Sequence, residues 1–169
     1  MPVTVKRAVL WRSETRNAPG MLARTLHPLA DVHQDLQLVI GYAYPDRHSA
    51  AIEVWPVESA PARNAARRAG LSSCNFPCLV VEGENRAGLS YDIAHALSDA
   101  GINLSFFIAQ KIGTRYSALF GFDADSEADL AVKLIRKVTA AAETPTRRPA
   151  TRAARRTRPR RTARSGARR

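Results

Sequence analysis

The alternation of apolar and polar residues predicts the same series of elements twice along this chain. Each series opens with an apolar strand, at residues 3–11 and again at 77–83, and each strand leads into an Asn-x-x-Gly turn. A helix follows in both halves, because apolar residues recur at helical spacing. Its predicted buried stripe is Leu22, Leu26 and Leu29 in the first half and Leu89, Ile93 and Leu97 in the second. Pro28 is expected to kink or shorten the first helix.

Two further strands follow each helix. They are expected at 36–44 and 48–55 in the first half, and at 103–111 and 115–122 in the second. Pro45-Asp46 and Gly113 supply the turn chemistry between them. These strands and turns predict a β-hairpin in each half of the chain.

A second helix closes each half. Residues 58–70 predict a polar helix, whereas Leu130, Leu134 and Val138 predict an apolar face on the later one, which starts at a capping box over 126–129. The order strand, helix, strand, strand, helix is the split βαβ, ferredoxin-like plan without its fourth strand. Residues 71–75 offer a short fourth strand to the first half. The fourth strand of the second half is expected to be missing or borrowed.

The expected fold class is therefore α+β, with two ferredoxin-like units paired through an antiparallel sheet and helices on one face. The units are residues 1–71 and 72–143, followed by a disordered basic tail at 144–169. A unit of roughly 65 residues is only marginally stable alone, so the two units are expected to dock.

The two halves also match residue by residue. At an offset of 68 positions there are eleven identities between 14–50 and 82–118, against roughly three expected by chance. They are Glu14, Asn17, Gly20, His27, Leu29, Asp31, Leu36, Ile40, Arg47, Ser49 and Ala50 with their later counterparts. This indicates a duplicated unit. His27 and His95 are interpreted as partly exposed packing residues.

Charge separates the tail from the body. Eleven of the 26 lysines and arginines lie at 144–169, where no acid occurs, and the other 15 balance the 15 acids of residues 1–143. The tail has no aliphatic residue larger than alanine and is expected to be disordered. Its arginines would attract RNA, DNA or anionic lipid without sequence preference; a solubilising or incidental tail is the alternative. The candidate nucleic-acid contacts are Arg147, Arg148, Arg155, Arg156, Arg160 and Arg161.

Motifs for catalysis are absent from the sequence. It has no nucleophile elbow, phosphate-binding loop, zinc-protease motif or dinucleotide motif, so we predict no catalytic residue, metal ligand or cofactor. Cys74 and Cys78 do not have redox or zinc spacing, and two reduced, partly buried thiols are expected. No apolar window reaches the ~18 residues of a membrane span, and no secretory signal is recognised, so we expect a cytoplasmic protein.

The stretches "RNAPGML" and "AGINLSFFI" resemble the ACT domain, in which N-x-P-G-x-L follows an apolar strand and "GIN" leads into another. The resemblance covers residues 3–142 as a tandem pair, with departures at Ala87 and at "HQDL". ACT domains are regulatory sensors of small molecules, most often amino acids. The resemblance implies units that pair, often side by side into a continuous eight-stranded sheet, with the ligand at the pair interface against the first strand–helix loop.

The resemblance implies a ligand site at residues 14–22 and 82–89, facing Asp35 and Asn103. Residue chemistry favours the same loops, because a helix N-terminus offers unpaired N–H groups to a carboxylate and glycine permits close approach. The candidate residues are Glu82, Asn85, Arg86, Ala87, Gly88, Leu89 and Asn103, and Asn17, Gly20, Met21, Leu22 and Asp35.

The second loop is expected to bind an anion better than the first. Pro19 lacks the backbone donor that Ala87 keeps. Arg86 is predicted to bind a carboxylate, and Glu82 and Glu84 an ammonium group. Asn17 and Asn85 are expected either to cap the helices or to bind the ligand, and the plain alternative is that both loops contain only turn and cap residues.

Two functions of different class remain open. The first is a non-catalytic regulatory module that binds an amino acid and acts alone, as a homodimer or on an enzyme in trans. The second is a nucleic-acid-associated protein that binds phosphates through its tail, with the folded part as scaffold or dimeriser. A simple interaction partner of an enzyme is a third.

Overall fold

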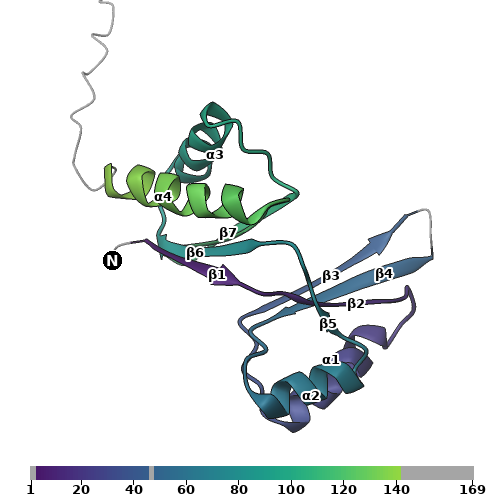
Figure 1. The fold of residues 1–169 in the computed structure, drawn as a ribbon. Coiled ribbons are helices and arrows are strands. Elements are labelled where there is room, and N and C mark those ends of the chain that lie inside the picture. Colours follow the sequence, from purple (N-terminus) through teal and green to yellow (C-terminus); the bar gives the residue numbers. More distant parts are fainter. Residues whose placement is uncertain (1–2, 46–47, 142–169) are drawn as a thin grey trace, which may run out of the picture.

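The computed structural model describes residues 3–45 and 48–141, so the arginine-rich tail and its predicted contacts lie outside the described part. The described residues form two four-stranded antiparallel sheets, and a pair of helices covers the outer face of each (Figure 1). The α+β class and its two ferredoxin-like units are thereby confirmed.

The first unit has the sheet order β3-β4-β2-β5. Its elements are β2 (Trp11–Arg16), α1 (Met21–Asp31), β3 (Leu38–Tyr44), β4 (Ser49–Trp55), α2 (Ala60–Arg68) and β5 (Ser72–Ser73). The polar α2 forms because Ser59 caps it, accepting from the Ala62 N–H at 3.1 Å, and because small alanines pack against the sheet. The predicted short fourth strand at 71–75 is confirmed as β5, which pairs with β2.

Two details of α1 differ from the prediction. Pro28 does not shorten the helix, which has the 11 residues of its counterpart in the second unit. Leu22 is not part of the buried stripe but is 46% exposed, and Thr25 is buried with Leu29 in its place. The helix is rotated so that its first turn presents Leu22 to solvent.

The second unit has the sheet order β1-β6-β8-β7. Its elements are β1 (Thr4–Ala8), β6 (Cys78–Glu84), α3 (Leu89–Asp99), β7 (Phe106–Ile112), β8 (Arg115–Gly121) and α4 (Asp125–Ala141). The fourth strand is borrowed, as the sequence allowed, and it comes from the start of the chain. β1 pairs with β6 from Thr4 opposite Glu82 to Ala8 opposite Cys78.

The expected single strand over 3–11 is therefore wrong. It divides into β1 and β2, which belong to different sheets. A continuous apolar run cannot reveal such a crossing, because each part is apolar for its own core: Val5 packs under α3 and α4, and Trp11 packs under α1 and α2. With β5 in the first sheet, sheet membership crosses the predicted boundary after residue 71 in both directions.

The units also dock differently from the expectation. The two sheets do not pair through their edges; their helix-free faces meet where the chain crosses from β1 to β2 (Figure 1). The residues buried there are Ala8, Leu10, Trp55, Cys78, Val80 and Leu119. Both open faces carry large apolar side chains near the crossing, and mutual burial removes these from water.

Arg7 fastens the borrowed strand to the last helix. Its Nη1 donates to Asp125 Oδ1 at 2.8 Å and its Nη2 to Asp129 Oδ1 at 2.6 Å. Asp125 is the first residue of α4, one residue before the predicted capping box, and Glu127 closes that turn by accepting from the Ala124 N–H at 3.2 Å. Asp125 at the start of α4 and Asp129 one turn later thus hold β1 against the helix.

The repeat of 68 residues is preserved in the elements up to the hairpins. α1 and α3 are related by this offset, and so are β3 and β7, but β4 and β8 are related by 66 because the first hairpin is longer. The identities of Ser49 and Ala50 with their counterparts are therefore not structurally equivalent. His27 and His95 are exposed and do not pack in the core as interpreted; each lies beside the aspartate four residues on, at 3.1 and 2.9 Å.

Gly83 and its counterpart Thr15 show that the edge of the first strand is covered differently in the two units. A Cβ at Gly83 would lie 2.6 Å from Val3 Cγ2 and 2.8 Å from Val3 Cα, because the chain entering β1 lies directly over it. Its counterpart in the first unit is Thr15. β5 covers only Trp11 and Arg12, so a side chain has room there.

We predict that Gly83→Ala destabilises the protein by about 1–3 kcal/mol, because the added methyl group must displace the backbone at Val3 and loosen β1. Gly41→Ala is the matched control, since a Cβ at Gly41 meets nothing within 4 Å. Urea unfolding followed by circular dichroism measures both, and equal stability of the two variants would contradict the account.

Candidate functional site

The two predicted loops start their helices in the same way. Gly20 and Gly88 are the N-caps of α1 and α3, with φ of 86° and 82°, and in the described residues no side chain bonds to either cap. The interpretation of Asn17 and Asn85 as caps is therefore wrong. Their backbone N–H groups instead donate to the carbonyls of His48 at 3.0 Å and Thr114 at 2.8 Å, which closes each loop against the adjacent hairpin.

The loops lie at opposite ends of the molecule. β2 and β6 both begin at the crossing, where Trp11 and Cys78 lie, and both run away from it before their loops begin. Asp35 and Asn103 precede β3 and β7, which start back at the crossing because Leu38 pairs with Trp55 and Phe106 with Gly121. Within one chain, the structure does not bring either loop together with Asp35 or Asn103.

In the second loop the predicted anion-binding arginine is already engaged. Arg86 Nη1 lies 2.6 Å from Asp92 Oδ2, and Asp92 supplies negative charge to the first turn of α3. Arg86 Nε is buried and has no hydrogen-bond partner in the described part of the chain. A ligand carboxylate would therefore have to compete with Asp92 for the guanidinium group.

Beside the first loop there is a polar groove of about 670 Å³, which exists because β5 leaves the edge of β2 open beyond Arg12. The predicted residue Met21 lines it. Arg24 and Arg68 offer donors for a carboxylate, and Asp31 offers an acceptor for an ammonium group. This groove lies next to α1 and so joins the predicted loop to a space large enough for a small ligand.

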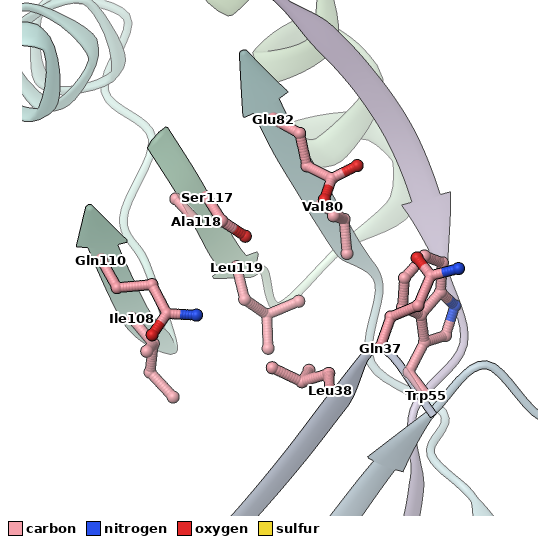
Figure 2. A pocket seen from close by; sticks show the side chains of 10 residues that line it. All are labelled: Gln37, Leu38, Trp55, Val80, Glu82, Ile108, Gln110, Ser117, Ala118 and Leu119. Carbon is pink, nitrogen blue, oxygen red and sulfur yellow. The ribbon is translucent and has the colours of Figure 1, made fainter. Parts of the chain in front are cut away.

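Glu82 lies away from the loops, on the helix-free face of β6. Figure 2 shows it beside a hollow between the sheets, with the amides of Gln37 and Gln110 on the same rim. Leu38, Trp55 and Leu119 supply apolar walls. The volume is about 40 Å³, enough for a few waters and too small for an amino acid. The structure therefore separates Glu82 from the residues 85–89 with which it was grouped.

A polar cluster that the sequence pattern did not predict lies on the open face of the first sheet. Arg12 Nη2 donates to Glu14 Oε1 at 3.0 Å and to the Tyr44 hydroxyl. Tyr42 donates to Glu53 Oε1 at 3.1 Å. Burial and the Glu53 carboxylate raise the pKa of Tyr42, so its hydroxyl remains a donor at neutral pH.

Glu53 is the clearest signal that the sequence held for this cluster. It is an acid within the apolar strand "SAAIEVW", and only 4% of it is exposed. Arg12 Nη1 lies 3.7 Å from its carboxylate, and Arg12 Nε is buried without a hydrogen-bond partner among the described residues. A carboxylate is rarely buried unless it is paired, so this position marks a special environment.

The two thiols lie in the apolar cluster between the helix-free faces of the two sheets. Both are unbridged in the described structure, with Cys78 buried at the start of β6 and Cys74 half-buried, as expected. Burial, followed by the Glu53 carboxylate, raises the pKa of Cys74 to about 11. Burial, Cys74 and Glu53 together raise the pKa of Cys78 to about 12. At neutral pH both remain thiols and are poor nucleophiles.

No family model and no curated protein matches this chain. Solved structures do match. The ligand-free regulatory subunit of aspartate kinase from Thermus thermophilus has a TM-score of 0.57 at 15% identity, over 82% of this chain and 97% of that one. Aspartokinase alpha and beta subunits give 0.56 at 14% identity, over 82% and 97%. A protein from Bacteroides thetaiotaomicron gives 0.61 at 11% identity, over 80% and 89%.

The chain has a tandem ACT-type fold. At these identities the likeness concerns the fold alone. Both units of this chain have the same strand–loop–helix pattern, with a glycine at the start of α1 and α3. In the described residues, no helix is long and apolar enough to cross a membrane, and no group of three His, Cys, Asp or Glu side chains could hold a metal ion.

We predict that Ellman's reagent labels Cys74 and Cys78 at pH 8 about a hundredfold more slowly in the native protein than in urea, because raised pKa values leave little thiolate. Since the folded values lie above the ordinary value of 9.0, the two thiols stabilise the fold fully below pH 9. That stability is lost as the pH rises through about 11 and 12. Cys78→Ala should flatten this loss in urea unfolding; native labelling as fast as in urea would contradict the burial of the thiols.

Proposed function

We propose that this protein is a non-catalytic regulatory module that binds an amino acid beside the N-terminus of α1 or α3. The observation that carries the proposal is that the likeness to the aspartate kinase regulatory subunit spans both units, with 97% of that subunit covered. A tandem pair of this fold is an architecture used for regulation. The polar groove beside α1 and the uncapped helix starts supply the chemistry that an amino acid needs.

Each helix start supports the binding of a carboxylate. Backbone N–H groups in the first turn point along the helix axis and carry the positive end of its dipole. Because a glycine without a side-chain cap precedes each helix, a ligand can approach those groups closely. In the first unit, Arg24, Arg68 and Asp31 line the adjoining groove and complement the two charges of a zwitterion.

We propose that the protein works as a homodimer or on an enzyme in trans. Within one chain the loops lie far from Asp35 and Asn103, so a site that uses both needs a second copy placed end to end or edge to edge. Ligand binding at such an interface favours the paired state by mass action, and this preference can be passed to a bound enzyme.

Ala87→Pro tests whether the second loop binds the ligand, because it removes a single backbone N–H group from that loop. The substitution converts "NRAGL" to the Pro-Gly form that the first loop already has at Pro19, so the fold is expected to persist, but it removes one N–H donor. If α3 binds the carboxylate, affinity should fall about tenfold or more, the value of a hydrogen bond to a charged group. Pro19→Ala is the matched control and should strengthen binding only if the first loop is the site.

The measurement is a thermal shift screen of the full chain against the common amino acids, followed by calorimetric titration. A ligand at a hundred times its dissociation constant adds about 2.7 kcal/mol of stability. A chain that ignores every amino acid would refute the sensor proposal, and a hit that neither loop variant alters would refute its placement at the loops.

A second function is proposed for the tail, on the observation that residues 144–169 hold eleven arginines and no acid. We propose that it binds nucleic acid phosphates without sequence preference. Full-length protein should bind single-stranded RNA with an affinity that falls steeply with salt, whereas a chain ending at residue 143 should not bind. RNA binding that persists in the shortened chain would contradict this role of the tail.

A further inference from the structure

A cleft of about 510 Å³ opens between the helix-free faces of the two sheets, apart from both loops; it shares only Ile108 with the hollow in Figure 2. Both units contribute to it. Its lining combines Arg12, Ile40, Tyr42 and Glu53 from the first sheet with Phe76, Ser105, Phe106, Ile108 and Asp123 from the second unit and the linker. A volume of this size falls within the range of small-molecule pockets.

The charges around the cleft are predominantly negative. Glu53 and Asp123 line it together with one cation, Arg12, and Arg12 is also drawn to Glu14 outside the lining. Two carboxylates, Glu14 and Glu53, therefore share one guanidinium group, while Asp123 accepts a hydrogen bond from the Ser105 hydroxyl. Glu53 is almost fully buried and its carboxylate lies 3.7 Å from Arg12 Nη1, so a further cation in the cleft would lie close to a poorly screened negative charge.

The rest of the lining is apolar and aromatic. Phe76 and Phe106 stand edge to face, with ring centroids 5.7 Å apart, and Ile40 and Ile108 extend the apolar wall. Gly121 makes this wall possible, because a Cβ there would lie 2.1 Å from the Phe106 ring. Aromatic faces next to carboxylates attract an organic cation through its apolar body and its charge at once.

We propose that this cleft binds a small organic amine, with the protonated nitrogen at the carboxylates of Glu53 and Asp123 and the apolar body between Phe106 and Ile108. The negative charges of Glu53 and Asp123 disfavour an organic acid in the same place. The Tyr42 hydroxyl keeps one oxygen of Glu53 occupied and so orients the carboxylate in the cleft. The proposal does not rest on the amino-acid site at the loops, from which the cleft is separated by the length of the strands.

The probes are phenethylamine, 3-phenylpropionate and phenylalanine, titrated separately into the full chain by calorimetry and by NMR of the backbone amides. Phenethylamine should bind and shift resonances of the cleft residues, and 3-phenylpropionate should not bind there. Phenylalanine should bind the cleft at least tenfold more weakly than the amine, because its carboxylate meets Glu53 and Asp123. Equal cleft binding of the acid and the amine would overturn the proposal.

Two variants locate the amine. Glu53→Gln keeps the size of the side chain and Asp123→Asn changes an exposed residue that should not disturb folding; each should weaken phenethylamine binding about tenfold or more. Glu58→Gln, on the surface outside the cleft, is the matched control and should bind the amine like the parent chain. Unchanged affinity in a folded Asp123→Asn protein would refute the site.

The loop variant separates this inference from the proposed function. Ala87→Pro should leave phenethylamine binding unchanged whatever it does to amino-acid binding. If Ala87→Pro abolishes amine binding, the amine occupies the loop site and the cleft proposal is wrong.

Discussion

The pairing of β1 with β6 is the constraint on which the rest of the structure depends. It completes the second sheet from the opposite end of the chain and supplies Val5 to that core, and Arg7 ties it to α4. Because β2 begins only three residues after β1 ends, the same pairing holds the first sheet against the second. The helix-free faces of the two sheets are therefore held together near the crossing, where Leu10, Trp55 and Cys78 are fully or almost fully buried.

This arrangement makes two related units unequal. The second unit has its first strand covered along five residue pairs, and Gly83 provides the space for that cover. The first unit has only two pairs with β5, and Thr15 lies beside the open groove instead. A duplicated sequence has thus acquired one closed edge and one accessible edge.

The crossing also brings polar residues of both units together between the sheets. Strands that start together place Arg12 and Glu53 opposite Ser105 and Asp123 across a cleft. Burying a carboxylate there is unfavourable unless it is compensated, and Tyr42 and Arg12 supply compensating interactions. The same geometry places the helix-start loops at the far ends of the strands, so the two loops are separated from the central cleft.

The sequence by itself determined the elements within each unit: the two amphipathic helices of each half, the hairpins, the repeat of 68 residues and the glycine that starts α1 and α3. Each of these follows from local periodicity or backbone geometry. The division of residues 3–11 between two sheets was decided only in three dimensions, because both parts are apolar and alternate alike. The same holds for the exposure of Leu22, for the pairing of Arg86 with Asp92 and for the burial of Glu53, since each depends on which faces of distant segments come to touch.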